Sequence, residues 1–487
     1  MRDQVNTLFD QVVRIVKRAT QFFNLAGDLV FVRQGRGLSY VTTQNLNGYL
    51  SSHLEIQYLS IRDGVPRPTR YALLSRDLAP AFLTSPRVSG QFPRLTHYTR
   101  VPVFDRHWRL VARPGYHPAS EIYYDGERIR PARKTPLLNR LLKGFCWRSD
   151  VDRVNYVGLL LTAVTMLHWI GKHPLAIFNS NIPRLGKTLL ARILALIVDG
   201  TGRTIAFIQN DEEFERNIST YMETGERVVI VDNARHAKRQ IEVSSGVLER
   251  CVTDIVLSFR RLRTNTAMRR PNDVIFCITM NAALLSVDLR HRGLPINLHF
   301  AGNVRKRTFD IKEPEAFVLD HRWDLIAELI GMVQGWVRAG RPVPDDAATH
   351  SVSQVWAGAI DGILRSNGYH GFLSNFEESE RTFDAEYPAL VEVCAAFHDE
   401  LPSTAKTWSD RIVSRGLWSD RLRDERGEEK SPQAMATIVG TLFSSHTGTT
   451  FTVDGRVYRL RRAPETESAS HESPRFWFER VEEQEQR

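Results

Sequence analysis

The stretch NSNIPRLGKTLLARIL, residues 179–194, decides how the rest of the chain is interpreted. Its second half, Gly186-Lys187-Thr188 followed by an apolar run, is typical of the end of a phosphate-binding loop. Its first half departs from the G-x-x-x-x-G-K-[ST] pattern, because Asn181 occupies the place of the first glycine and Arg184 lies inside the loop. The stretch predicts a nucleotide site with an altered loop.

The segments on either side of this loop match what phosphate binding requires. LAIFNS predicts a strand before it and TLLARILALIV a helix after it, so backbone N–H groups and a helix N-terminus meet at the loop. Lys187 is predicted to reach the β- and γ-phosphates of ATP, and Thr188 to hold Mg²⁺ through its hydroxyl. A chance Gly-Lys-Thr at a helix start is the alternative. The predicted nucleotide-binding residues are Asn181, Pro183, Arg184, Leu185, Gly186, Lys187, Thr188 and Leu189.

A second predicted strand, RVVIVDN at 227–233, ends in an acid. Asp232 would hold Mg²⁺ through water, together with Thr188. Asn233 cannot take a proton, but its amide would orient the attacking water by hydrogen bonds. A buried strand capped by Asp-Asn in a turn is the alternative explanation of this segment.

A third predicted strand, DVIFCITM at 273–280, is followed by Asn281, which would contact the γ-phosphate or the lytic water. Further on, Arg290 and Arg292 lie in a predicted loop. In a ring of subunits, such arginines stabilise transition-state charge at a neighbour's γ-phosphate. Taken singly, each is explained equally well as a surface arginine.

Composition bounds the class of protein. The chain has 487 residues, 42% of them hydrophobic and 25% charged, which is ordinary for globular domains. The longest apolar run, 156–170, is too short to span a bilayer and predicts a buried helix. Without a signal peptide or a membrane segment, a cytoplasmic protein is expected. Four scattered cysteines with no Cys-x-x-Cys pair argue against a zinc site or a disulfide framework.

Positive charge is concentrated in the first third of the chain. The net charge is +9, and residues 1–150 carry 23 Lys and Arg against 11 Asp and Glu, a balance of +12. The remainder therefore sums to −3. This asymmetry indicates a polyanionic partner, with a solvated basic surface as the alternative.

Strand-like and helix-like segments alternate between 166 and 300, which indicates an α/β fold with a parallel sheet covered by helices. Near the C-terminus, helices precede TFTVDGRVYRL, a predicted β-hairpin that turns at Asp454-Gly455 and is compatible with a winged helix. We expect a basic α+β N-terminal domain (1–165), a P-loop ATPase core (166–320), a helical lid (321–380) and a winged-helix-like C-terminal domain (381–487).

In their order, these motifs resemble those of the AAA+ replicative helicases of prophages, plasmids and other mobile elements. That family is related to superfamily 3 viral helicases and is similar in outline to MCM helicases. VVIVDNA is similar to the family's aspartate-asparagine Walker B strand. VDLRHRGLPINL is similar to its D-L-x-R-R segment, with His291 at the place of the first arginine and Arg292 matching the second. The resemblance covers most of the chain and implies an AAA+ core with a helical lid that uses ATP and Mg²⁺.

The family further implies a hexameric ring around DNA, with a hairpin that projects into the pore. The matching region is SFRRLRTNTAMRR, residues 258–270, which contains no acid. A basic surface hairpin that supports subunit contacts is the alternative for any one of its arginines. The expected partners are single-stranded or forked DNA, further copies of the chain, and a primase or initiator of the same element. The predicted DNA-binding residues are Arg260, Arg261, Arg263, Arg269 and Arg270.

The altered first half of the loop bears on how active the site is. Glycine permits positive φ, and asparagine is the best-tolerated substitute in left-handed conformations, so Asn181 is compatible with binding. Pro183 would stiffen the loop, and the bulk of Arg184 has to point away from the phosphates. We expect an ATP-hydrolysing DNA-unwinding motor. Two alternatives stay open: a non-hydrolysing or weakly hydrolysing DNA-binding initiator that uses ATP to assemble, and an AAA+ remodeller of proteins, which the arginine-rich hairpin disfavours.

Overall fold

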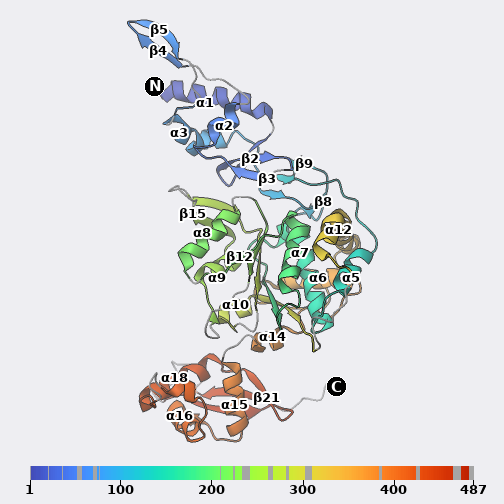
Figure 1. Ribbon diagram of the computed structural model, residues 1–487, viewed down its shortest axis with the longest axis vertical. Helices are drawn as coiled ribbons and strands as arrows, with labels where there is room; N and C mark the ends of the chain where they lie inside the picture. The colour runs from blue at the N-terminus through green and yellow to red at the C-terminus, as the bar shows by residue number, and fades with distance from the viewer. Residues whose placement is uncertain are drawn as a thin grey trace. The chain divides into compact units, whose positions relative to one another are not determined.

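The computed structural model of the chain divides into two compact units, residues 1–380 and 381–487 (Figure 1). Both units combine helices with sheets around buried apolar cores, so the mixed α/β composition predicted for the chain is confirmed. The structure describes residues 2–19, 21–35, 37–51, 58–69, 74–75, 77–208, 210–222, 225–232, 242–260, 267–280, 284–301, 310–382, 386–423, 428–463 and 473–481.

A five-stranded parallel sheet forms the centre of the first unit, with the strand order β12-β13-β17-β11-β19. Its inner strands are short apolar runs buried on both faces, as expected for a parallel sheet covered by helices. The parallel sheet predicted from strand-helix alternation is therefore confirmed. The bounds are β11 (Leu175–Ser180), β12 (Ile205–Ala206), β13 (Val228–Asp232), β17 (Ile275–Thr279) and β19 (Gly293–Leu298).

Helices connect these strands and cover the sheet. α7 (Lys187–Asp199) packs against β11, β13 and β17, and α6 (Asp150–Val164) packs against β19. A capping box of Ser149 and Asp152 begins α6, and its residues 156–164 are all buried. The buried helix predicted over 156–170 is confirmed as far as Val164, where α6 ends. The other elements here are η2 (Met166–His168), α8 (Asp211–Met222), β14 (Glu242–Val243), α9 (Gly246–Thr253), β15 (Val256–Arg260), β16 (Ala267–Pro271), β18 (Leu284–Leu285) and α10 (Val287–His291).

A group of helices over residues 314–382 follows the sheet in the chain. The longest, α12, packs against α6, α7 and α13 through a buried face that includes Leu325, Leu329 and Trp336 at helical spacing. None of the helices in the described part of the chain has the length and apolar content that crossing a membrane requires. The bounds are α11 (Pro314–Asp320), α12 (Arg322–Arg338), α13 (Gln354–Arg365) and α14 (Phe376–Thr382).

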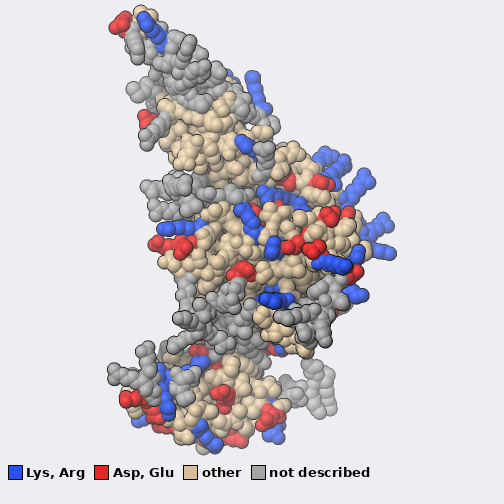
Figure 2. Space-filling model, in the orientation of Figure 1, with Lys and Arg blue, Asp and Glu red and all other residues tan. Residues whose placement is uncertain are grey.

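Small sheets and short helices make up the part of the first unit that precedes α6. The rings of Phe9 and Phe82, and those of Phe22 and Phe31, make edge contacts in one of its cores. Lys and Arg side chains project from the surface around α5 and α12 (Figure 2). The bounds are α1 (Arg2–Val16), η1 (Lys17–Ala19), β1 (Phe22–Leu25), β2 (Asp28–Arg33), β3 (Gly37–Tyr40), α2 (Leu46–Ser51), β4 (Tyr58–Arg62), β5 (Val65–Thr69), α3 (Leu78–Thr84), α4 (Pro86–Ser89), β6 (His97–Thr99), β7 (Val103–Phe104), β8 (Leu110–Val111), β9 (Gly115–His117), β10 (Ile122–Tyr124) and α5 (Pro136–Lys143).

The second unit packs its helices against an antiparallel sheet of order β20-β23-β22-β21. Trp408 and Phe443 meet in its core. The predicted hairpin is confirmed: β21 and β22 join through Asp454 and Gly455, whose φ angles of 49° and 74° suit a two-residue hairpin turn. The bounds are α15 (Tyr387–Phe397), β20 (Ser403–Thr404), α16 (Ala405–Ser414), α17 (Ser419–Leu422), α18 (Pro432–Ser445), β21 (Thr450–Val453), β22 (Arg456–Ala463) and β23 (Arg475–Arg480).

Candidate nucleotide site

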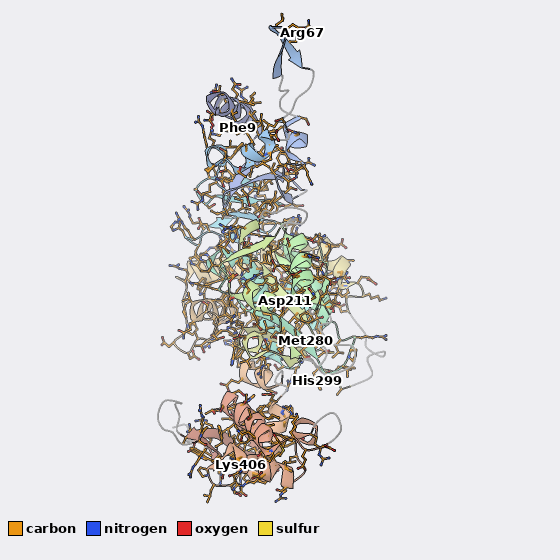
Figure 3. The ribbon with its side chains drawn as sticks, turned by 90° about the vertical axis from the view of Figure 1, so that its left-hand side faces the viewer. Phe9, Arg67, Asp211, Met280, His299 and Lys406 are labelled. Atoms are coloured by element: carbon orange, nitrogen blue, oxygen red, sulfur yellow. The ribbon has the colours of Figure 1, made fainter. Side chains whose placement is uncertain are left out.

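The loop between β11 and α7 lies at a switch point of the sheet, where strands of the chain are added on opposite sides of β11. β11 lies between β17 and β19, and after α7 the chain continues to β12 at one edge, whereas β19 lies at the other. Crevices at such switch points, outside the carboxyl ends of the strands, are the usual ligand sites of open parallel sheets. Met280, directly after β17, and His299, directly after β19, mark this end of the sheet in Figure 3. The loop therefore lies where a ligand is expected.

Two residues of the loop have a left-handed backbone conformation. Gly186 has a φ of 104° and caps the N-terminus of α7, and Arg184 has a φ of 67°. A Cβ at Gly186 would lie 3.3 Å from the ring of Phe145, so both conformation and space favour glycine there. Asn181 is not among the residues with positive φ, so the loop does not use the tolerance of asparagine for a left-handed backbone. Arg184 carries this backbone strain instead.

The side-chain amide of Asn181 ties the start of the loop to the chain just after β19. Its Nδ2 donates to the carbonyl oxygen of Phe300 over 3.1 Å, and its Oδ1 accepts from the backbone N–H of Phe300 over 3.1 Å. The remaining loop residues differ in exposure: Pro183 and Arg184 are exposed, Leu185 is buried and Leu189 is half-buried. Asn181 thus has a structural partner that a glycine would lack.

Lys187 is buried beneath the loop, with 6% of its surface exposed. Its Nζ donates a 2.6 Å hydrogen bond to Oγ of Ser180, whose hydroxyl donates to the carbonyl oxygen of Ile182 over 2.7 Å. Burial lowers the pKa of Lys187 to about 8, against the charge of Asp232, which raises it. Anionic phosphates at the loop would stabilise the ammonium form, so the lysine is suited to phosphate contact.

Thr188 and Asp232, the two predicted metal ligands, lie in contact. Oγ1 of Thr188 donates to Oδ1 of Asp232 over 2.7 Å, and Oγ1 of Thr279 donates to the same oxygen over 2.6 Å. Hydroxyl and carboxylate oxygens are hard ligands of the kind that Mg²⁺ prefers, and Mg²⁺ usually takes only one or two protein ligands beside water and substrate phosphates. The residues present therefore fit this ion.

Sequence reasoning misses two hydroxyl residues of this site, Ser180 and Thr279. Ser180 accepts from Lys187 and ends β11, and Thr279 donates to Asp232 and ends β17. Each closes a buried strand beside the phosphate loop. A polar residue at the last position of such a strand is the signal that would have identified both.

Several predicted residues cannot be placed. Asn233, Asn281, Arg261 and Arg263 lie outside the described residues, and for Arg260 only the backbone is described. Their roles stay predictions.

The two arginines predicted to act on a neighbouring subunit lie at the amino end of β19. Arg290 belongs to α10, and the carbonyl oxygen of Arg292 accepts a 2.9 Å hydrogen bond from the backbone N–H of Leu175, the first residue of β11. The phosphate loop leaves β11 at Ser180, and the strand between these two residues is about 17 Å long. Nη2 of Arg292 lies 3.9 Å from the carboxylate of Asp288. The Arg292 backbone is therefore far from the loop of its own chain.

The basic segment predicted to contact DNA includes the antiparallel pair β15 and β16. Arg269 is exposed, whereas Arg270 is 6% exposed and donates to the Asp273 carboxylate over 2.9 Å and to the carbonyl oxygen of Glu226 over 2.9 Å. Successive residues of a strand point to opposite faces, so one arginine faces water and the next faces the core. The prediction that Arg270 contacts DNA is wrong, because its guanidinium is buried in an ion pair.

Comparisons with solved structures find distant likenesses. One structure of the C-terminal region of NrS-1 has a TM-score of 0.48 and 11% identity, covering 92% of this chain and 97% of its own. Another has a TM-score of 0.45 and 12% identity, with the same coverage. A structure of JCV helicase with a bound inhibitor has a TM-score of 0.26 and 16% identity, covering 51% of this chain and 64% of its own. No protein-family model and no curated protein matches the chain.

Proposed function

We propose that the protein is an ATP-dependent DNA helicase, a ring-forming AAA+ motor that acts in replication of a mobile genetic element. One observation carries the proposal: a buried Lys187 and the Thr188–Asp232 contact lie together at the loop that leaves a parallel sheet. A lysine for the β- and γ-phosphates, beside a hydroxyl and a carboxylate for Mg²⁺, is the combination that P-loop ATPases use.

Each residue has a task in the transfer of the γ-phosphoryl group to water. Backbone N–H groups of the loop and the N-terminus of α7 hold the phosphates, and Lys187 contacts the β- and γ-phosphates. When bound through Thr188 and Asp232, Mg²⁺ supplies charge neutralisation between these phosphates. Asn233 orients the attacking water, and Asn281 contacts the γ-phosphate or that water. Thr279 keeps the Asp232 carboxylate in place.

Oligomerisation is part of the proposal because, among the described residues, the predicted Arg292 lies at the end of β19 that is remote from the loop of its own chain. Arg292 lies at the amino end of β19, about 17 Å of strand from the loop, which supports a role at a neighbour's γ-phosphate rather than at its own. Arg290 is the second candidate for this role. A closed hexamer would supply one such arginine to every site.

DNA is the proposed substrate of the motor. The exposed Arg269, together with Arg260, Arg261 and Arg263, would contact phosphates of a single or forked strand in the pore. Residues 321–380 would act as the helical lid and 381–487 as a winged-helix-like domain, with a primase or initiator of the element as a further partner. The core 166–320 and the basic N-terminal domain 1–165 complete this arrangement.

One observation favours a second candidate, an initiator that binds ATP to assemble on DNA and hydrolyses it weakly or not at all. Arg184 has a left-handed backbone conformation within the loop, which is unfavourable for a bulky side chain and departs from a typical phosphate-binding loop. The intact Lys187, Thr188 and Asp232 favour the motor over this alternative.

Phosphate release with and without single-stranded DNA tests the proposal. We expect ATP hydrolysis that DNA stimulates and that Lys187→Ala abolishes, with Lys172→Ala, an exposed lysine, as the matched control. Strand separation of a labelled fork should follow the same pattern. ATP binding without hydrolysis would favour the initiator, and unchanged turnover in Lys187→Ala would overturn the site.

A further inference from the structure

A polar pocket of about 350 Å³ lies in the first unit, and none of its lining residues belongs to the phosphate loop. It is built from segments 94–97, 105–109 and 118–122 beside Leu167. The second and third of these segments adjoin β8 and β9 in the chain, two strands that Figure 1 labels. We call it the arginine pocket, after Arg94, Arg106 and Arg109 in its lining. Its volume lies at the lower end of the ~300–1,000 Å³ found for small-molecule sites.

A buried carboxylate shapes the wall that carries two of these arginines. Oδ1 of Asp105 accepts from the backbone N–H groups of His107 and Arg109 over 2.8 and 2.9 Å, and Oδ2 accepts from Nε of Arg109 over 2.8 Å. Burial alone would raise the pKa of Asp105, but these hydrogen bonds outweigh it and lower the pKa below its ordinary value. The carboxylate therefore stays charged at neutral pH and holds the turn over 105–109 in one conformation.

The lining carries more positive than negative charge. Arg109 pairs with Asp105 at 2.8 Å, and Nε of Arg94 lies 3.6 Å from the Glu121 carboxylate. Arg106 donates to the ring Nε2 of His107 over 3.1 Å, and within the described part of the chain no carboxylate pairs with it. Arg94 and Arg109 are 73% and 62% exposed at their side chains, so each retains N–H donors that face solvent.

The inner wall is held by the central sheet. His97 is 11% exposed at its side chain, and its Nδ1 lies 3.7 Å from Oδ2 of Asp273, near the start of β17. Asp273 also pairs with Arg270 at 2.9 Å and with Arg227, directly before β13, at 3.8 Å. A ligand in the pocket would therefore meet walls that are already ordered, which reduces the entropy lost on binding.

We propose that the arginine pocket is a second phosphate-binding site, which takes a phosphate group of either a free polyphosphate or a nucleic-acid strand. Guanidinium groups bind phosphate through paired, charge-assisted N–H donors, and three of them line this pocket. The unpaired charge of Arg106 gives an anion a net attraction there. The site is separate from the nucleotide loop and from the β15–β16 hairpin in the sense that it shares no lining residue with either.

The test uses the full chain in a Lys187→Ala background, so that the nucleotide site does not hold the probe. Arg94→Ala with Arg106→Ala removes two exposed arginines of the pocket. The matched control, Arg113→Ala with Arg128→Ala, removes two exposed arginines from the same region that do not line it. One arm measures binding of inorganic tripolyphosphate by calorimetry, and the other measures binding of a labelled single-stranded oligothymidylate by anisotropy.

We expect the pocket variant to weaken at least one probe by at least tenfold, and the control to change neither by more than about twofold, because charge-assisted contacts are lost in the first case only. Loss of tripolyphosphate binding identifies a small-anion site, and loss confined to the oligonucleotide identifies a strand contact. Equal effects of the two double variants on both probes would overturn the proposal. Unfolding midpoints measured alongside, together with Arg106→Lys, which keeps the charge and removes the paired donors, separate binding loss from misfolding.

Discussion

Thr188 and Asp232 are in direct hydrogen-bond contact, with 2.7 Å between Oγ1 and Oδ1. The contact joins the first turn of α7 to the last residue of β13, although β17 lies between β13 and β11 in the sheet. The two oxygens proposed to bind Mg²⁺ are thus adjacent. Little rearrangement is needed for both to reach one ion, and the intervening β17 supplies the hydroxyl of Thr279 to the same carboxylate.

Thr279→Val is expected to raise the Mg²⁺ concentration needed for half-maximal ATP hydrolysis by about tenfold, because residues that orient metal ligands contribute to metal affinity on that scale. Valine keeps the shape of this buried side chain and removes only the hydroxyl donor. Thr279→Ser, which restores the donor, should recover most of the loss. An unchanged Mg²⁺ requirement in Thr279→Val would show that the Asp232 carboxylate needs no support from β17.

Nucleotide affinity is expected to fall as pH rises above about 8, the pKa to which burial lowers Lys187. Above this pH the free protein holds a neutral lysine, so binding of phosphates requires proton uptake and weakens by up to about tenfold per pH unit. The sign is opposite for folding: the unfolded lysine, with a pKa of 10.5, binds the proton more tightly, so the cost of burying this group shrinks as pH rises from about 8 to 10.5. Fluorescent-nucleotide titrations from pH 7 to 10 measure the first effect. A slope that persists in Lys187→Ala would assign it to another group.

Arg184→Gly is expected to preserve or raise ATP hydrolysis, because glycine adopts the φ of 67° without steric cost. Arg341 offers a matched control, since it is also exposed, has a φ of 61° and lies outside the loop. Arg341→Gly should relieve similar strain and leave turnover unchanged. A loss of more than tenfold confined to Arg184→Gly would mean that the Arg184 side chain itself contacts the nucleotide.

Arg269→Ala is expected to affect DNA binding and Arg270→Ala to affect stability, although the two residues are neighbours. Arg269→Ala should flatten the dependence of log affinity for single-stranded DNA on log salt by about 0.7 per contact, with unchanged stability. Arg270→Ala should lower the free energy of unfolding by about 3 kcal/mol, because it removes one partner of a buried ion pair with Asp273. Salt titrations and urea unfolding of both variants check this. A reversed pattern would mean that β16 exposes its other face.

Mixing Arg292→Ala subunits with Lys187→Ala subunits is expected to restore part of the hydrolysis that each lacks alone. Some interfaces of a mixed ring combine an intact lysine with an intact arginine, which is sufficient if the arginine acts on its neighbour. The reason for this expectation is that Arg292 lies just before β19, beside the first residue of β11, and not at the loop that follows β11. A mixture as inactive as its components would argue for action within one chain or for a ring that needs every site.

Local patterns predicted what depends on neighbours in sequence. The strand before the loop, the helix after it and the Asp454-Gly455 turn each follow from a few adjacent residues, and all three are present. Asp232 was expected at a strand end, and β13 does end there. Alternation of strands and helices was sufficient to predict a parallel sheet, because two parallel strands need a crossover connection and a helix usually supplies it.

Features that depend on distant partners were not predictable. In the sequence, Arg270 cannot be distinguished from the other four arginines of its segment. Its burial depends on a contact with the carbonyl oxygen of Glu226, which is distant in the chain. The contact of Thr279 with Asp232 exists only because β17 pairs with β13. The order of strands in a sheet cannot be predicted from the sequence of any single strand. The role of Asn181 likewise depends on Phe300, 119 residues away.

That contact changes the meaning of the missing glycine. One donor and one acceptor of the Asn181 amide meet the carbonyl and the N–H of a single residue, so the side chain imitates a peptide group. It adds one more rung, made by a side chain, to the ladder that β11 and β19 form up to Ser180 and Leu298. The absent glycine therefore does not weaken the start of the loop. The Asn181 side chain attaches it to the chain just after β19 and extends the pairing of the two strands by one residue.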